Sequence, residues 1–162
     1  MPLEVKRAWT YDVTNGLESR IESVTAVRPI PVAGVQGMEF NGPLGVSRFA
    51  WVGNALVAQC TSNLVFTPPI PLLASNGKQE RWAGKVTWMG RPIQATAEVS
   101  ERPFSLTLVA RTIESTESDL VLHLPSHTIE LLTWFEPGVG IVKQEQRSGP
   151  KLEIGVEMVE GH

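Results

Sequence analysis

Short runs in which apolar and polar residues alternate cover most of the chain. In residues 92–99, for example, Ile93, Ala95, Ala97 and Val99 alternate with polar residues. A period of two places successive side chains on opposite faces of a strand, so each run predicts a strand with one buried face. The 3.6-residue period of an amphipathic helix is not sustained over any long stretch. The pattern therefore predicts strands throughout and little helix.

Turn signals separate these runs at short intervals. Residue pairs that favour tight turns occur at Asn15-Gly16, Gly53-Asn54 and Pro137-Gly138. Short strands between closely spaced turns are typical of all-β proteins, and we expect about ten antiparallel strands in meander order. A sheet of that size must curl or close. The sequence thus predicts one all-β domain over residues 1–162, with a single antiparallel, strongly curved sheet that forms a half-barrel or a barrel.

The clearest hairpin is predicted over residues 128–147, around the turn Glu136-Pro137-Gly138. In its first strand, Leu131 points to a mostly apolar face, whereas Trp134 points to the opposite face, which becomes apolar only near the turn. Both faces are therefore expected to be covered at that end of the hairpin. Trp134 either packs under a loop or lines a cavity mouth or an oligomer contact.

A proline-rich segment, TPPIPLL at residues 67–73, interrupts the alternation. Proline has no backbone N–H, so we expect this segment to be extended and not to serve as a central strand. Because it is also apolar, it is predicted to cross an apolar surface, such as the open end of the curved sheet. The alternative is that it binds an aromatic groove on a partner.

Size, charge and cysteine content exclude several classes of protein. The chain has 162 residues, a net charge of −3 and no block of basic residues, so no nucleic-acid partner is expected. The single cysteine, Cys60, is predicted to be a small buried apolar side chain. No apolar run reaches the roughly 20 residues of a membrane span. The residues after Met1 do not read as a signal peptide, so a cytoplasmic location is expected, or an envelope location if the sequence is a mature form.

Residues suited to catalysis or metal binding are few. His123 and His127 are separated by Pro125, which disfavours the helix that would place both imidazoles on one face. A catalytic role would require one of them to meet an acid and a nucleophile in a cleft. No nucleophile motif and no glycine-rich phosphate loop is present. We therefore predict a protein that is not an enzyme, with no catalytic residues, no metal and no cofactor.

Tryptophan is the most informative residue type. Five tryptophans occur, and Trp82 and Trp88 fall on the same face of one predicted strand. The same residues could fill the core of a curved sheet or line a cavity for an apolar ligand, and composition does not separate the two.

Several motifs resemble those of an uncharacterised bacterial family of the TapB-like kind. The segment WFEPGVGIVK at residues 134–143 is similar to the W-[YF]-x-P-G-V-G-h-V-[KR] hairpin near the C-terminus of that family. Residues 9–11, 67–72 and 82–90 resemble its W-x-Y strand, its proline-rich segment and its W-x-G-x-x-x-W-x-G hairpin. The family looks similar to the half-barrel of the LolA/LolB lipoprotein carriers, which shelter acyl chains in a concave cavity. The resemblance implies such a half-barrel and no catalytic residues.

These observations lead to a prediction of a non-catalytic protein that holds a lipid or another apolar ligand in the concave face of the sheet. The predicted lining residues are Trp82, Trp88, Phe104, Leu106, Leu131 and Trp134, with a lid that contains Pro69, Ile70 and Leu72. The alternative is a structural or interaction protein that forms a homodimer or a partner contact, through a sheet edge or the Pro68–Leu73 segment.

Overall fold

The computed structural model describes residues 7–109 and 111–161, with side chains up to residue 159. Every regular element in this part of the chain is a strand. The strands are β1 (Ala8–Asn15), β2 (Glu18–Val32), β3 (Val35–Gly42), β4 (Gly45–Val52), β5 (Ala55–Thr61), β6 (Leu64–Leu73), β7 (Gln79–Trp88), β8 (Arg91–Thr107), β9 (Thr112–His123), β10 (Thr128–Glu136), β11 (Gly140–Ser148) and β12 (Lys151–Gly161).

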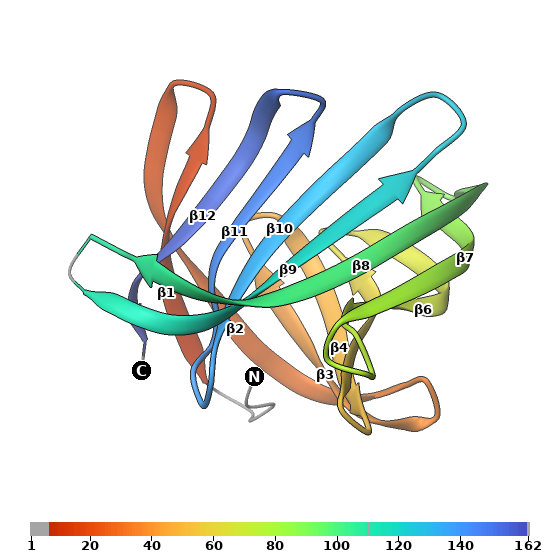
Figure 1. Ribbon diagram of the computed structural model, residues 1–162, viewed down its shortest axis with the longest axis horizontal. Coiled ribbons are helices and arrows are strands. Elements are labelled where there is room, and N and C mark those ends of the chain that lie inside the picture. The colour runs from red at the N-terminus through yellow and green to blue at the C-terminus, as the bar shows by residue number, and fades with distance from the viewer. Residues whose placement is uncertain (1–6, 110, 162) are drawn as a thin grey trace.

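These twelve strands form one closed antiparallel barrel in meander order (Figure 1). Each strand pairs with its neighbours in sequence, and β1 pairs with β12 to close the barrel. The all-β class and the meander order predicted from the alternation are confirmed. Of the two predicted forms, the chain adopts the barrel.

The predicted hairpin at residues 128–147 is also confirmed. It consists of β10 and β11, which pair from Glu130 opposite Arg147 to Glu136 opposite Gly140. Gly138 in the turn has φ +77°, a conformation that glycine adopts without the steric cost of a Cβ atom. The proline and glycines of this segment therefore act in the turn that the sequence indicated.

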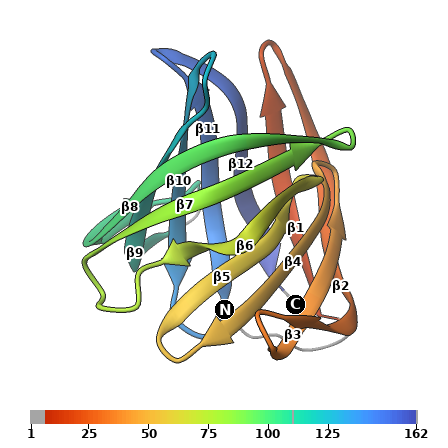
Figure 2. The ribbon, with the colours of Figure 1, turned by 90° about the vertical axis from the view of Figure 1, so that its right-hand side faces the viewer.

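The proline-rich segment is extended and is not a central strand, as the prolines predicted. It lies within β6, which pairs with β7 only at Val65–Thr67 and pairs with β5 as far as Leu73 (Figure 2). The prolines therefore fall where β6 has left β7 and has a partner strand on one side only, an arrangement that tolerates the missing N–H groups.

After leaving β7, this part of β6 crosses the inner faces of β8 and β9. The Ser118 hydroxyl donates a hydrogen bond to the carbonyl of Leu72 over 2.5 Å, and the Ala74 N–H donates to the Glu101 carboxylate over 2.9 Å. Ile70 and Leu72 are fully buried. The segment is thus part of the core, and neither the predicted lid nor the predicted partner contact is consistent with this burial.

The long β8–β9 hairpin extends beyond the barrel wall. Its last residue pairs with β10 are Trp134 opposite Glu117 and Phe135 opposite Thr116, and from there it continues as a two-stranded ribbon. We call residues 102–109 and 111–117 the arm. Figure 1 shows it crossing in front of β10, β11 and β12.

The arm buries the opposite face of its strands. On β8, Ala97 and Val99 are buried toward the barrel interior, whereas on the arm the even-numbered residue Leu106 is buried. The β8–β9 register has no shift, so residues of opposite parity point to opposite faces. The arm therefore covers the outer face of the barrel and creates a second, external layer of core.

Candidate functional site

The barrel interior is largely filled by side chains. Trp82, Leu131 and Leu72 are buried in it, and the rings of Trp9, Phe40 and Phe49 pack in sequence with centroids 5.9 and 5.4 Å apart. A cavity of about 80 Å³ lies among these side chains, and we call it the inner chamber.

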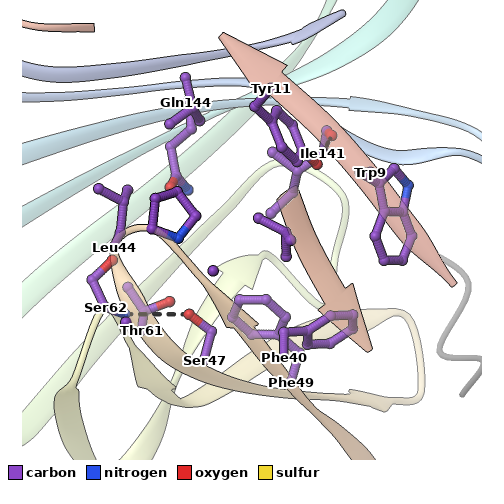
Figure 3. A pocket seen from close by; sticks show the side chains of 15 residues that line it. Trp9, Tyr11, Phe40, Leu44, Ser47, Phe49, Thr61, Ser62, Ile141 and Gln144 are labelled. Carbon is purple, nitrogen blue, oxygen red and sulfur yellow. Dashed lines mark hydrogen bonds between the residues drawn. The ribbon is translucent and has the colours of Figure 1, made fainter. Parts of the chain in front are cut away.

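Figure 3 shows the inner chamber between two walls. Trp9, Tyr11 and Ile141 lie on one side of it, and Phe40 and Phe49 lie on the other. Its lining is mainly apolar, and Leu44, Ser47, Thr61, Ser62 and Gln144 complete it.

The polar atoms of the aromatic wall are already bonded within the protein. The Tyr11 hydroxyl donates to the carbonyl of Ile141 over 2.7 Å, and the Trp9 indole N–H donates to the carbonyl of Val139 over 3.0 Å. Burial raises the pKa of the Tyr11 phenol well above its usual range, so it stays protonated. Ligand pockets usually enclose about 300–1,000 Å³, so an acyl chain does not fit the chamber in this conformation.

A larger space lies outside the barrel. It is a groove of about 770 Å³ between the tip of the arm and the outer faces of β1, β2, β11 and β12, and we call it the arm groove. The residues that line it are Asp12, Thr14, Ile21, Leu108, Val109, Arg111, Lys143, Glu145, Leu152, Gly155, Val156, Glu157, Met158 and Val159.

Four aliphatic side chains of the groove are unusually exposed. Ile21 is 61% exposed, Val109 98%, Leu152 41% and Val159 59%. Single exposed apolar residues are normal, but several that share one concave surface usually mark a contact site. These four residues come from three different hairpins, so the fold brings them together.

Polar contacts fix the tip of the arm over the groove. The Arg111 guanidinium forms two hydrogen bonds with the Glu136 carboxylate, over 2.9 and 2.6 Å. The Val109 N–H donates to the Glu157 carboxylate over 3.3 Å. Leu108, beside these contacts, is buried. The arm is therefore held at its tip by side chains from β10 and β12.

The base of the arm is fixed around Trp134. Its indole N–H donates to one oxygen of Glu117 over 2.9 Å, and Arg102 binds the other oxygen over 2.7 Å. The Phe104 ring lies 6.3 Å from the Trp134 ring, and the Lys143 ammonium lies 5.6 Å from it. Trp134 thus has a covered outer face, as the hairpin pattern predicted, and the arm provides the cover.

The predicted lining residues do not form one site. Trp82, Leu131, Ile70 and Leu72 belong to the inner core, and Pro69 is half-buried beside them, whereas Phe104, Leu106 and Trp134 belong to the external layer under the arm. Trp88 shares a strand face with Trp82, but it lies at the end of β7 and is 57% exposed. It therefore lines no enclosed space.

Sequence reasoning missed the arm groove. Its signals were apolar residues at positions where the alternation calls for polar ones, such as Val159 at the end of β12. These residues can be recognised as parts of one groove only once the positions of their strands relative to the arm are known.

The histidines and the cysteine have local roles. His127 Nδ1 is 2.7 Å from the Ser126 hydroxyl, and His123 Nδ1 is 3.4 Å from that of Thr128. Within the described residues no group of three or more potential ligands is placed to hold a metal. Cys60 is buried, as predicted, with its thiol 3.3 Å from the Val46 carbonyl oxygen.

Comparisons with known proteins identify a shared fold and no family. No protein-family model and no curated protein matches the sequence. A candidate lipoprotein from Parabacteroides distasonis ATCC 8503 has a similar structure, with a TM-score of 0.58 and 13% identity over 100% of this chain and 97% of that one. That likeness shows the fold alone.

Two further solved structures are more distant. One is a candidate exported protein with a YmcC-like fold from Bacteroides fragilis NCTC 9343, with a TM-score of 0.43 and 12% identity over 100% of this chain and 98% of that one. The other is the hypothetical lipoprotein YmcC of Escherichia coli K12, with a TM-score of 0.47 and 8% identity over 96% of this chain and 84% of that one.

These findings bear on two sequence predictions. No family model supports the resemblance to the TapB-like family. The structural comparison does show a fold shared with the candidate lipoprotein from P. distasonis. The expected cytoplasmic location finds no support in this likeness, which shows the fold alone. Among the described residues, no helix has the length and apolar character needed to cross a bilayer.

Proposed function

We propose that this chain is a non-catalytic binding protein for a lipid or another apolar molecule, and that the molecule occupies the arm groove. The observation that supports this location is the volume of the two spaces. The groove, at about 770 Å³, lies within the size range of ligand sites, and the inner chamber, at about 80 Å³, lies well below it.

The exposed aliphatic residues of the groove provide the driving force. An apolar molecule that removes roughly 200 Å² of this surface from water gains about 5 kcal/mol before the costs of association. The arm contributes Leu108 and Val109 to one wall, and β2 and β12 contribute Ile21 and Leu152 to the opposite wall. A ligand between them would be covered on two sides.

Native mass spectrometry of freshly purified protein, followed by denaturing organic extraction, tests this function. We expect a co-purifying apolar adduct that the double variant Ile21→Asn/Leu152→Asn loses. Leu17→Asn is the matched control, because Leu17 is fully exposed in the β1–β2 turn and does not line the groove. Ser47→Leu, which fills the inner chamber, should leave the adduct in place.

The same experiment has a clear contrary result. An adduct that survives in the groove variant but disappears in Ser47→Leu would place the ligand in the inner chamber, the concave face that the sequence predicted. A protein that carries no adduct and binds no added alkyl probe would contradict the binding function itself.

A second candidate function is a contact through a sheet edge, and one observation favours it. Within the described part of the chain, residues 79–84 of β7 pair with β8 alone, because β6 pairs with β7 only at residues 85–87. An unpaired strand edge can accept a strand from another chain. A dimer mass in light scattering that Ala83→Pro abolishes would support this alternative, and a monomer would contradict it.

The proposal includes an envelope location. Its support is the fold shared with the protein from P. distasonis, which is described as a candidate lipoprotein. Fractionation of the native host, with detection of the protein by antibody, tests this point. Recovery in the soluble cytoplasmic fraction alone would contradict it.

A further inference from the structure

A row of directly opposed residues runs across the outer face of the barrel and ends in the arm groove. In register, β2 to β1 to β12 to β11, the row contains Ile21, Asp12, Glu157 and Lys143. It continues through Trp134 of β10, Glu117 of β9 and Arg102 of β8. We call these seven residues the outer row.

The charges of the outer row do not balance. Arg102 pairs with Glu117 over 2.7 Å, and Lys143 lies 3.4 Å from Glu157. These two pairs leave Asp12 as the one carboxylate of the row without a cation. Its side chain contacts the Ser19 hydroxyl, and none of the cations that the structure describes forms an ion pair with it.

The other charges around the groove are engaged elsewhere. Arg111 binds Glu136, Arg147 binds Glu145 over 2.5 Å, and Lys143 also lies 3.4 Å from Glu145. Asp12, in contrast, lies directly opposite Glu157 across the β1–β12 pair, and like charges directly opposite each other are unfavourable. The lining of the groove therefore combines aliphatic side chains with more carboxylates than cations.

We propose that the arm groove selects an amphipathic molecule with an aliphatic tail and a cationic head group, with the cation beside Asp12 and Glu157. The tail would lie between the arm tip and the side chains of Ile21, Leu152 and Val159. A cation beside these two carboxylates offsets the repulsion between them and is attracted to both. This inference rests on the proposed function and specifies the class of its ligand.

Three probes with the same ten-carbon tail test the head-group preference. Isothermal titration calorimetry would compare decyltrimethylammonium, decyl sulfate and decyl maltoside, each below its micelle concentration. We expect decyltrimethylammonium to bind about tenfold more tightly than decyl maltoside, which is about 1.4 kcal/mol. Decyl sulfate should bind most weakly, because the carboxylates repel it.

Two variants test whether the preference for a cationic head group depends on Asp12 in the arm groove. Asp12→Asn should abolish the about tenfold advantage of the cation over decyl maltoside. The matched control is Glu98→Gln, which removes an exposed carboxylate on β8 that does not line the groove. It should keep the preference intact.

The contrary results separate this inference from the function on which it rests. Equal binding of all three probes, or tightest binding of decyl sulfate, would overturn the head-group inference and leave an apolar groove. Binding that persists in Ile21→Asn/Leu152→Asn, or binding of no probe at all, would overturn the groove as the ligand site.

Discussion

At the scale of single residues, Trp134 attaches the base of the arm to the barrel. It joins β10 to the base of the arm through Glu117 and packs on Phe104. Trp88, the partner that sequence analysis assigned to the same ligand site, is instead exposed at the end of β7. The two tryptophans therefore serve as a matched pair for mutation.

Trp134→Phe should destabilise the protein by about 1–2 kcal/mol, because it keeps a ring but removes the hydrogen-bond donor to the buried Glu117. Trp88→Phe should change the free energy of unfolding by less than about 0.5 kcal/mol. Urea denaturation followed by far-UV circular dichroism measures both. Equal effects of the two changes would contradict the assigned role of Trp134.

Asp119 is a residue whose charge opposes folding. Its Oδ1 atom is buried without a hydrogen-bond partner. Burial, and then the nearby Glu130 and Glu117 carboxylates, raise the pKa of Asp119 in the folded protein. A carboxyl with a raised pKa favours the folded state while it is protonated, and this contribution is lost as the pH rises through the folded-state pKa.

Asp119→Asn should therefore raise the stability at pH 7. The gain should shrink toward zero as the pH falls below about 3.9, the usual pKa of an aspartate in an unfolded chain. Thermal unfolding at pH 7 and in acid, with the wild-type protein alongside, checks the sign. A variant that is less stable at pH 7 would show that the charged form of Asp119 is stabilised by the fold.

At the scale of elements, the arm is attached by the apolar side chains that it buries, such as Leu106 and Leu108, by polar contacts at its tip and by Trp134 at its base. The Arg111–Glu136 pair is half-exposed on the arginine side, and exposed ion pairs contribute only about 0.2–1 kcal/mol. Its loss should therefore loosen the arm without unfolding the barrel.

Hydrogen exchange tests the attachment of the arm. Arg111→Gln should speed amide exchange in residues 104–117 by up to about fivefold and leave exchange in β3 to β5 unchanged. Arg81→Gln, which removes the exposed Arg81–Glu98 pair on β7 and β8, is the control. Faster exchange throughout the barrel would mean that the arm and the barrel unfold together.

The narrow contact between β6 and β7 is a second element-scale feature. Gly84 lies against it, and a Cβ atom there would be 2.4 Å from the carbonyl oxygen of Thr67. Gly84→Ala should cost about 1–3 kcal/mol because backbone would have to move. Gly155→Ala is the control, since its nearest neighbour would be 3.9 Å away. Similar melting temperatures for the two variants would contradict the close approach of β6.

At the scale of the whole molecule, local sequence signals predicted the barrel well and the site poorly. The alternation at Ala95, Ala97 and Val99 and the turn at Gly138 both depend on neighbouring residues, so they are readable from sequence. The alternation of Phe104, Leu106 and Leu108 was also visible. The face of the arm that becomes buried is determined by its contact with β10 to β12. These strands follow later in the chain, so the pattern within the arm does not indicate the buried face.

The form of the proline segment was predicted correctly, but its role as a lid was not, for a related reason. Pro68, Pro69 and Pro71 correctly indicated a place where strand pairing stops, but it stops on one side only. The continued pairing with β5 and the burial of Ile70 depend on the curvature of the whole barrel. Properties of the closed structure therefore decided both the role of this segment and the position of the groove.

The closure between β1 and β12 has a consequence for how the chain could be cut. Every other contact between neighbouring strands joins segments that follow one another in sequence, and the β1–β12 contact brings Trp9 opposite Gly161. All neighbouring strands of the barrel are thus joined by turns, except β1 and β12. A circularly permuted chain, with a linker from Gly161 to Arg7 and new ends opened at the exposed Gly53-Asn54 turn, should fold to the same barrel.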